Sequence, residues 1–180
     1  SEKRSARWQE LLLLPVLTQA ETDGLQFMHE EEKLARDVYL AMGVLYDQRV
    51  FVNIPRSEQR HMEAIQGLCG KYGIGFNVKE PGKFHDPELQ KLYDRLVERG
   101  TVSRQDAFLV GALIEEIDIQ DLRDRIKRTQ HNDIKAVYEN LERGSMRHLN
   151  AFVFNFENRT GKTYVAQKMP QSEVDKTLNR

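Results

Sequence analysis

The sequence has few of the residues on which several common classes of protein depend. Its 180 residues include one cysteine, Cys69, which excludes an internal disulfide framework and a Cys-x-x-Cys metal centre within this chain. The apolar run at residues 11–14 is too short to span a bilayer. The formal net charge is −1, so nothing in the overall charge attracts nucleic acid or an anionic membrane.

The composition instead favours a helical, soluble protein with one domain. Charged residues make up 31% of the chain, against only 11 glycines and 5 prolines, and a chain of 180 residues is long enough to bury a core. The compartment stays open between the cytoplasm and export followed by removal of a signal. Whether the chain pairs with itself as a homodimer stays open as well.

Apolar residues recur at helical spacing along most of the chain, and start and stop signals divide it into helices. Asp23 marks the start of the first helix, Pro55 opens the second at a favoured first-turn position, and Ser103 is a good N-cap for the fourth. The predicted helices cover residues 23–46, 55 to 70 or 73, 87–98, 103–126, and 132 or 133 to 156.

No alternation typical of strands exceeds a few residues, so the predicted fold class is all-α. We expect a four-helix bundle of two antiparallel hairpins, joined by a long crossover that contains the short helix at 87–98. The predicted organisation is an N-terminal extension at 1–22, the bundle at 23–158, and a polar C-terminal tail at 159–180 that is extended or frayed.

Glu58 and His61 form a Glu-x-x-His pair within a predicted helix. A spacing of three residues places both side chains on one helix face. In four-helix carboxylate proteins such a pair supplies an imidazole nitrogen to one metal ion and a carboxylate that bridges to a second. The pair indicates a metal site only if other helices supply the remaining ligands.

The helix at 103–126 carries acids on its apolar face. At about 100° per residue, Asp118 lies roughly 40° and Asp121 about 20° from the centre of the apolar stripe. Glu115 lies at the edge of the stripe, whereas Glu116 points nearly opposite. Buried carboxylates need a cation or hydrogen-bond donors, so these acids indicate either a metal site or a structural network with Arg and Tyr.

Two more helices bring candidate ligands to the buried side. His148 falls among apolar residues of the last helix, and the first helix carries Glu30, Glu31 and Glu32, of which Glu30 faces away. Helical geometry does not choose between Glu31 and Glu32. The other histidines lack such company and are predicted to lie at the surface: His29, His85 and His131. Cys69 is predicted to be a small buried hydrophobic residue.

Several runs carry a family resemblance. Residues 32–39, with the pattern Glu-x-x-Ala-Arg-x-x-Tyr, resemble the first iron-binding helix of rubrerythrins, and Glu58-x-x-His61 and Glu115-x-x-Asp118 are similar to their second and third helices. Over residues 22–158 the chain resembles a ferritin-like family of unknown function. The four runs that carry this likeness are residues 27–39, 53–61, 114–122 and 144–149.

The resemblance implies a ferritin-like bundle with a two-metal carboxylate centre. By this resemblance, Glu32 and Glu115 are each the one ligand that their helix supplies, and Glu58 is a bridging carboxylate. His61 and His148 each supply an imidazole to one of the two metals. The choice of Glu32 over Glu31 rests on this resemblance.

The chain departs from the ferritin-like pattern at Ser145, where related proteins carry a second bridging glutamate. Serine is a poor metal ligand. Either Asp118, one turn after Glu115, compensates as a ligand, or the chain has one strong and one weak metal site.

Carboxylates and imidazoles suit two iron ions best, with manganese or zinc as alternatives. The leading hypothesis is redox chemistry with peroxide or dioxygen, as a rubrerythrin-like peroxidase or an oxidase, with electrons from a separate donor. The alternatives are a non-catalytic module that binds or handles metal and a metal-free helical interaction scaffold, so the sequence leaves enzyme activity open. Tyr39 is either a hydrogen-bond donor or electron relay at the centre, or a core aromatic residue.

Overall fold

The computed structural model describes residues 16–180, and within that range the chain is all-helical, with six helices and no strand. The helices are α2 (Gln19–Leu45), α3 (Val50–Tyr72), α4 (Pro87–Gly100), α5 (Arg104–Arg128), α6 (Asn132–Thr160) and α7 (Gln171–Thr177). The all-α prediction is confirmed, whereas the apolar run at 11–14 lies outside the described residues. None of the helices between residues 16 and 180 combines the length and the apolar character that crossing a bilayer requires.

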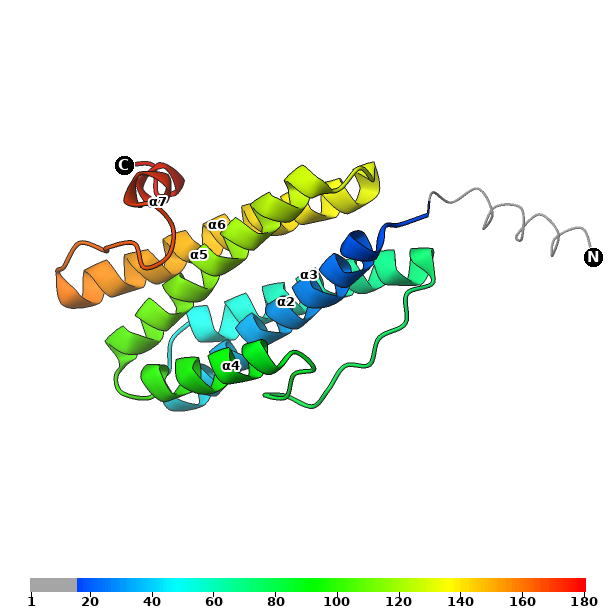
Figure 1. The fold of residues 1–180 in the computed structure, drawn as a ribbon. Coiled ribbons are helices and arrows are strands. Elements are labelled where there is room, and N and C mark those ends of the chain that lie inside the picture. Colours follow the sequence, from blue (N-terminus) through cyan, green and yellow to red (C-terminus); the bar gives the residue numbers. More distant parts are fainter. Residues whose placement is uncertain (1–15) are drawn as a thin grey trace, which may run out of the picture.

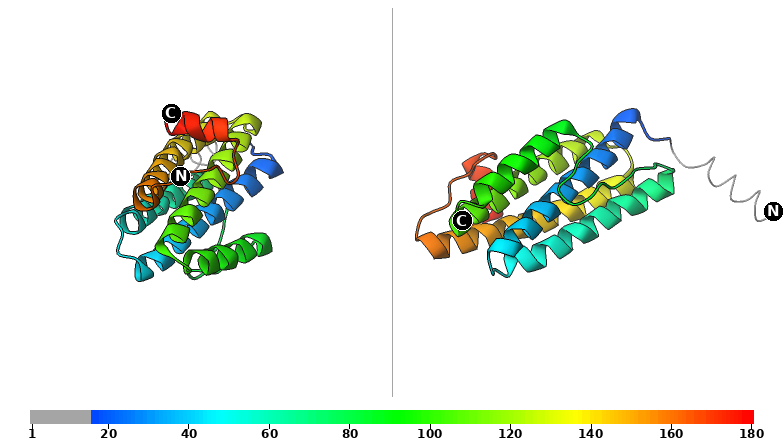
Figure 2. Two further views of the ribbon diagram at one scale, coloured as in Figure 1. Left: turned by 90° about the vertical axis from the view of Figure 1, so that its left-hand side faces the viewer. Right: turned by 90° about the horizontal axis from the view of Figure 1, so that it is seen from below.

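The four long helices lie side by side as two hairpins, α2 with α3 and α5 with α6 (Figures 1 and 2). A long connection, residues 73–103, joins the hairpins and contains α4. It runs back along the bundle, so α5 begins near the end at which α3 begins (Figure 1). All four helices can therefore contribute side chains at one level of the bundle.

N-cap residues set the starts of α2 and α5. The side chain of Thr18 accepts a hydrogen bond from the backbone N–H of Glu21 at 3.1 Å, and Glu21 accepts one from the N–H of Thr18 at 3.0 Å. This capping box starts α2 four residues before the predicted Asp23. Ser103 caps α5 as predicted, accepting a hydrogen bond from the N–H of Asp106 at 3.1 Å.

The prediction that Pro55 opens the second helix is wrong. The helix α3 begins at Val50, and Pro55 lies inside it. Proline removes one backbone donor, but burial of Phe51 and Ile54 against the core stabilises the extra turn. The end of α3 follows the predicted signal, because Gly73 adopts a left-handed conformation with φ of 67°.

The C-terminal segment also differs from the prediction, because residues 161–180 fold onto the bundle and include α7 (Figure 1). Tyr164, Met169 and Val174 are buried there. Glu116, on the outer face of α5, accepts hydrogen bonds from the Tyr164 hydroxyl at 2.5 Å and from the backbone N–H of Met169 at 2.7 Å. The sequence placed Glu116 away from the bundle core, and the structure shows that the C-terminal segment covers it.

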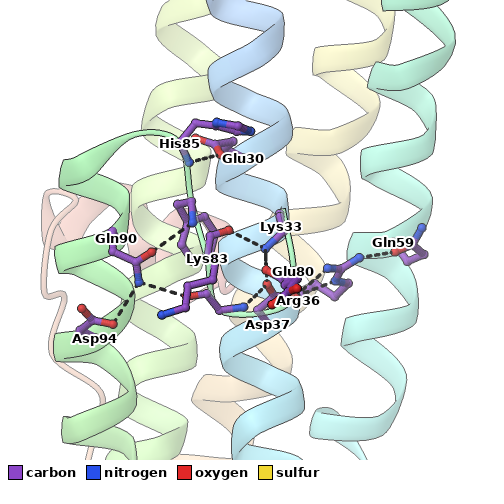
Figure 3. A network of polar contacts seen from close by, with 12 residues as sticks. Glu30, Lys33, Arg36, Asp37, Gln59, Glu80, Lys83, His85, Gln90 and Asp94 are labelled. Atoms are coloured by element: carbon purple, nitrogen blue, oxygen red, sulfur yellow. Dashed lines mark hydrogen bonds and ion pairs between the residues drawn. The ribbon is translucent and has the colours of Figure 1, made fainter. Parts of the chain in front are cut away.

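A buried ion pair fastens the crossover to α2 (Figure 3). The ammonium of Lys33 donates to the carboxylate of Asp37 at 2.7 Å and to the carbonyls of Glu80 and Lys83 at 2.9 and 3.0 Å. The carboxylate of Asp37 also accepts the backbone N–H of Gly82 at 2.9 Å. All three donors of the ammonium are used, and we call this group the crossover clamp.

The apolar core is divided in two. One cluster, around Tyr39 and Phe152, fills the end of the bundle near the α2–α3 turn. The other, around Leu25 and Leu141, fills the opposite end. Between them, along the bundle axis, lie the polar residues that the sequence singled out.

Candidate metal centre

Each of the four long helices supplies a candidate ligand at the level between the two apolar clusters. Five of the six predicted metal ligands come together there: Glu32 from α2, Glu58 and His61 from α3, Glu115 from α5 and His148 from α6. The three glutamates are 1% exposed, and the two histidines are 7% and 8% exposed. A charged cluster at this depth is costly unless its charges are balanced.

The five side chains form two groups that share Glu58. In the first, the Nδ1 atom of His61 lies 2.9 Å from Glu32 Oε2 and 2.8 Å from Glu58 Oε2. In the second, the Nδ1 atom of His148 lies 2.8 Å from Glu58 Oε1 and 3.5 Å from Glu115 Oε1. Within each group the three ligand atoms lie within 4.8 Å of one another. Glu58 therefore turns one oxygen toward each imidazole.

Several of these atoms have no hydrogen-bond partner among the described residues. They are both oxygens of Glu58, Oε1 of Glu32 and Nδ1 of His148. His148 and Glu58 are close enough for a hydrogen bond, but their atoms are not aligned for one. Buried polar atoms normally find partners, so atoms that converge without bonding each other fit a shared cation.

The two imidazoles are strongly basic in this setting. Burial by itself lowers the pKa of His61, but the carboxylates of Glu32 and Glu58 raise it to about 11. Burial also lowers the pKa of His148, but the carboxylates of Glu58 and Glu115 raise it to about 10. Without a metal, both rings hold a proton and act as counter-ions to the acids. A metal ion would displace those protons.

The carboxylates respond in opposite ways to this environment. Burial raises the pKa of Glu58, but His148 and His61 outweigh it and lower the value to about 2. Glu32 and Glu115 have raised pKa values because they are buried and because other carboxylates lie nearby. Glu58 is thus the acid that stays ionised between the two imidazoles.

Tyr39 contacts the centre directly. Its hydroxyl donates a hydrogen bond to Glu115 Oε1 at 2.6 Å, and its ring packs against Phe152 with the ring centres 5.0 Å apart. Burial, with the nearby charge of Glu115, raises the pKa of Tyr39 well above its usual value. The neutral hydroxyl therefore holds one oxygen of Glu115 and orients the other.

Asp118, the sixth predicted ligand, is buried beside the centre but belongs to neither group of three. Its Oδ2 atom accepts a hydrogen bond from the Ser145 hydroxyl. Burial and the charge of Glu115 raise the pKa of Asp118 to about 8. Ser145, the position at which the chain departs from the ferritin-like pattern, thus bonds Asp118.

The structure also separates Glu31 from Glu32, which the sequence left open. Glu32 faces His61, while the carboxyl of Glu31 has Asp118 and Asp121 as its neighbours on α5. Both glutamates are buried. The two adjacent acids thus point to different places between the helices.

One prediction about the remaining histidines is wrong. His29 is 2% exposed, because the crossover covers it: its ring lies 4.4 Å from that of Phe76, and its Nε2 atom lies 3.0 Å from the amide of Gln66. His131 is half-buried beside Glu21, and His85 is exposed as predicted. Helical spacing within α2 gave no sign of the crossover, so the burial of His29 could not be found from it. Cys69 is buried, as predicted.

Comparison with known proteins finds one domain family and a close relative. The family is described as an uncharacterized protein domain, DUF2202, and it matches residues 21–180. The uncharacterized protein MJ0754 of Methanocaldococcus jannaschii is 44% identical over 165 residues, covering 91% of this chain and 89% of its own.

A solved structure agrees with the fold over nearly the whole chain. The crystal structure of the hypothetical protein MJ0754 from Methanococcus jannaschii matches with a TM-score of 0.88 and 43% identity. The match covers 92% of this chain and 95% of that one. The shared fold thus extends well beyond the helices that carry the candidate ligands.

Proposed function

The chain belongs to the DUF2202 family, and we propose that this member binds two metal ions side by side within a ferritin-like four-helix bundle. The observation that carries the proposal is the pair of unpartnered oxygens of Glu58, each turned toward a different imidazole. A buried carboxylate with neither oxygen hydrogen-bonded is explained when each oxygen ligates a cation.

The ligands divide evenly between the two ions. Glu32 and His61 would hold one ion, Glu115 and His148 the other, and Glu58 would bridge them. Tyr39 orients Glu115 through its hydrogen bond, which is the role expected of a residue just outside the ligands. Asp118 is close enough to support this set or to join it.

The donor set favours iron, with manganese or zinc as alternatives. Carboxylate oxygens and imidazole nitrogens suit iron and manganese, whereas closed structural zinc sites favour thiolates. Cys69 does not supply a thiolate ligand to the centre, because it lies in the apolar cluster at one end of the bundle. Elemental analysis decides the metal.

We propose redox chemistry with peroxide or dioxygen as the leading activity. The five ligands would hold two iron ions, which would supply the two electrons that reduce such a molecule and would be reduced again by a donor. The apolar clusters on both sides of the centre exclude bulk water from it. The electrons would come from a separate donor protein, because one cysteine cannot form a rubredoxin-type iron centre.

Ser145 supports a second candidate, a module that binds or handles metal without catalysis. A centre with a single bridging carboxylate holds its ions with fewer ligands than one with two. The hydroxyl of Ser145 is also engaged by Asp118 and the carbonyl of Leu141, so it is not free to ligate. Activity of the loaded protein separates this candidate from the first.

The test combines metal content with turnover. Protein purified without chelators should contain two metal ions per chain, Glu58→Gln should contain fewer than one, and Glu63→Gln, an exposed acid on the same helix, should contain two. Consumption of peroxide by the iron-loaded protein supports the redox function, and two bound ions without consumption support metal handling. A wild-type chain that binds no metal contradicts both candidates and leaves the interaction scaffold.

A further inference from the structure

A second group of acids lies beside the candidate centre. Along α5, Glu115, Asp118 and Asp121 are spaced by three residues and share one face of the helix. Exposure rises along this row, from the buried Glu115 and Asp118 to the half-buried Asp121. Glu31 faces the row from α2, where burial and the nearby carboxylates of Asp118 and Asp121 raise its pKa. The acids therefore form a continuous series from the centre toward the surface.

Two of these buried acids each have one oxygen without a partner in the described part of the chain. Glu31 and Asp118 are each 4% exposed, and Glu31 Oε2 and Asp118 Oδ1 have no hydrogen-bond partner among the described residues. The charged neighbours of Glu31 are Asp118, Asp121 and Glu32, which are all acids. Unpartnered carboxylate oxygens that face one another are suited to a cation.

The charge of His61 acts on Asp118, but His61 is itself paired with Glu32 and Glu58. Within residues 16–180, none of Glu31, Asp118 and Asp121 takes part in an ion pair with lysine or arginine. The next cation along the face is Arg125, whose guanidinium lies 4.8 Å from the centre of the Phe27 ring. The interior of the row thus has carboxyl oxygens without a lysine or arginine partner in this part of the chain.

We propose that Glu31, Asp118 and Asp121 form an access path through which divalent cations pass between α2 and α5 to the candidate centre. The inference rests on the proposed function, since the path leads to that centre. Oxygen ligands without imidazole or thiolate bind first-row divalent ions such as Fe²⁺ and Mn²⁺ weakly, so ions pass along the path and are retained at the histidines. Asp121 is the outer end, because it is the member in contact with solvent.

The rate of metal binding tests the path separately from the centre. Co²⁺, whose visible absorption changes on coordination, is mixed with metal-free protein in a stopped-flow instrument, and the final stoichiometry is measured on the same samples. Asp121→Asn should bind about tenfold more slowly than the wild type, because the local negative potential that concentrates cations is reduced. It should still bind two ions.

The control is Asp124→Asn, which removes the same charge from an exposed position three residues further along α5. Its binding rate should change less than twofold. A second variant, Glu31→Gln, should be slowed like Asp121→Asn, with helix content by circular dichroism confirming that both fold.

Equal rates for the wild type and Asp121→Asn would overturn the path. Loss of one bound ion in Asp121→Asn would also overturn it, because Asp121 would then retain an ion rather than pass it on. Equal slowing in Asp124→Asn would assign the effect to overall charge and likewise overturn it. A wild type that binds no Co²⁺ contradicts the proposed centre itself, which distinguishes the two failures.

Discussion

The crossover clamp and the candidate metal centre are both buried and both charged, yet they satisfy their charges differently. In the clamp, Asp37 pairs with both Lys33 and Arg36, and backbone groups take up the remaining bonds. In the centre, acids outnumber bases, and both oxygens of Glu58 lack hydrogen bonds. Burying charge costs desolvation in both regions. In the clamp the buried side-chain atoms of Lys33 and Asp37 all have hydrogen-bond partners, whereas several in the centre have none within residues 16–180.

The difference separates structural burial of charge from functional burial. Glu116 resembles the clamp in this respect, because hydrogen-bond donors from the C-terminal segment surround its buried carboxylate. Buried charged side chains either hold two segments of the chain together or bind a ligand. Buried polar atoms without a hydrogen-bond partner indicate ligand binding. Substitutions in the clamp should therefore lower stability, whereas substitutions in the centre should lower metal binding.

The largest effect is expected from Lys33→Met. The variant loses three buried hydrogen bonds, to Asp37 and to the carbonyls of Glu80 and Lys83. Arg36 stays paired with Asp37, so the free energy of unfolding should fall by about 3 kcal/mol. Urea denaturation of the metal-free protein measures this. Lys91→Met, which breaks an exposed pair with Glu88, should change it by less than about 1 kcal/mol. A similar loss of unfolding free energy in both variants would show that the buried ion pair stabilises the fold no more than an exposed one.

A smaller effect is expected from Gly144→Ala, which changes the centre without removing a ligand. A Cβ atom at this position would lie 2.6 Å from His61 Nε2, so the imidazole must turn away. Metal affinity should fall by about 10- to 100-fold, as for other changes that reorient ligands.

The control for this change is Gly70→Ala in α3, where an added Cβ meets nothing within 4 Å. Competition with a chromophoric chelator gives both affinities. Unchanged affinity in Gly144→Ala would show that the orientation of His61 does not matter to metal binding.

The last comparison concerns pH, which changes stability gradually and without a substitution. His61 and His148 have folded-state pKa values raised to about 11 and 10, above the unfolded value of 6.5, so the metal-free folded state binds more protons. Their stabilisation is complete below pH 6.5 and is lost as pH rises toward 10–11, at up to about 1.4 kcal/mol per pH unit for each proton. Glu58, ionised throughout, adds no slope in this window.

The metal-loaded protein should behave differently, because metal ions replace those protons and bind more tightly as pH rises. Denaturation midpoints measured at pH 6.5, 7.5 and 8.5 with and without metal make the comparison. A metal-free protein that becomes more stable between pH 6.5 and 8.5 would contradict the protonated pair of imidazoles.

Much of the candidate site was predictable because it depends on helical spacing. The Glu-x-x-His spacing identified Glu58 and His61. Polar residues on or at the edge of apolar helix faces identified His148 and Glu115, and the structure brings all four together. The choice between Glu31 and Glu32 needed more, since adjacent residues on one helix point to different neighbours.

The fold was predictable where local signals act and not where distant segments meet. Ser103 and Gly73 marked helix ends correctly. The C-terminal segment was taken as frayed because its sequence is polar, but Glu116, more than forty residues earlier, supplies the acceptors that order it. The burial of His29 likewise depends on the crossover. Such contacts between distant segments leave no periodic pattern.

Anomalous diffraction from crystals of the metal-loaded protein, recorded on both sides of the metal absorption edge, tests the two-ion centre most directly. The proposal predicts two peaks per chain, one bounded by Glu32, Glu58 and His61 and the other by Glu58, Glu115 and His148. Peaks confined to the surface, or none between the four long helices, would contradict it.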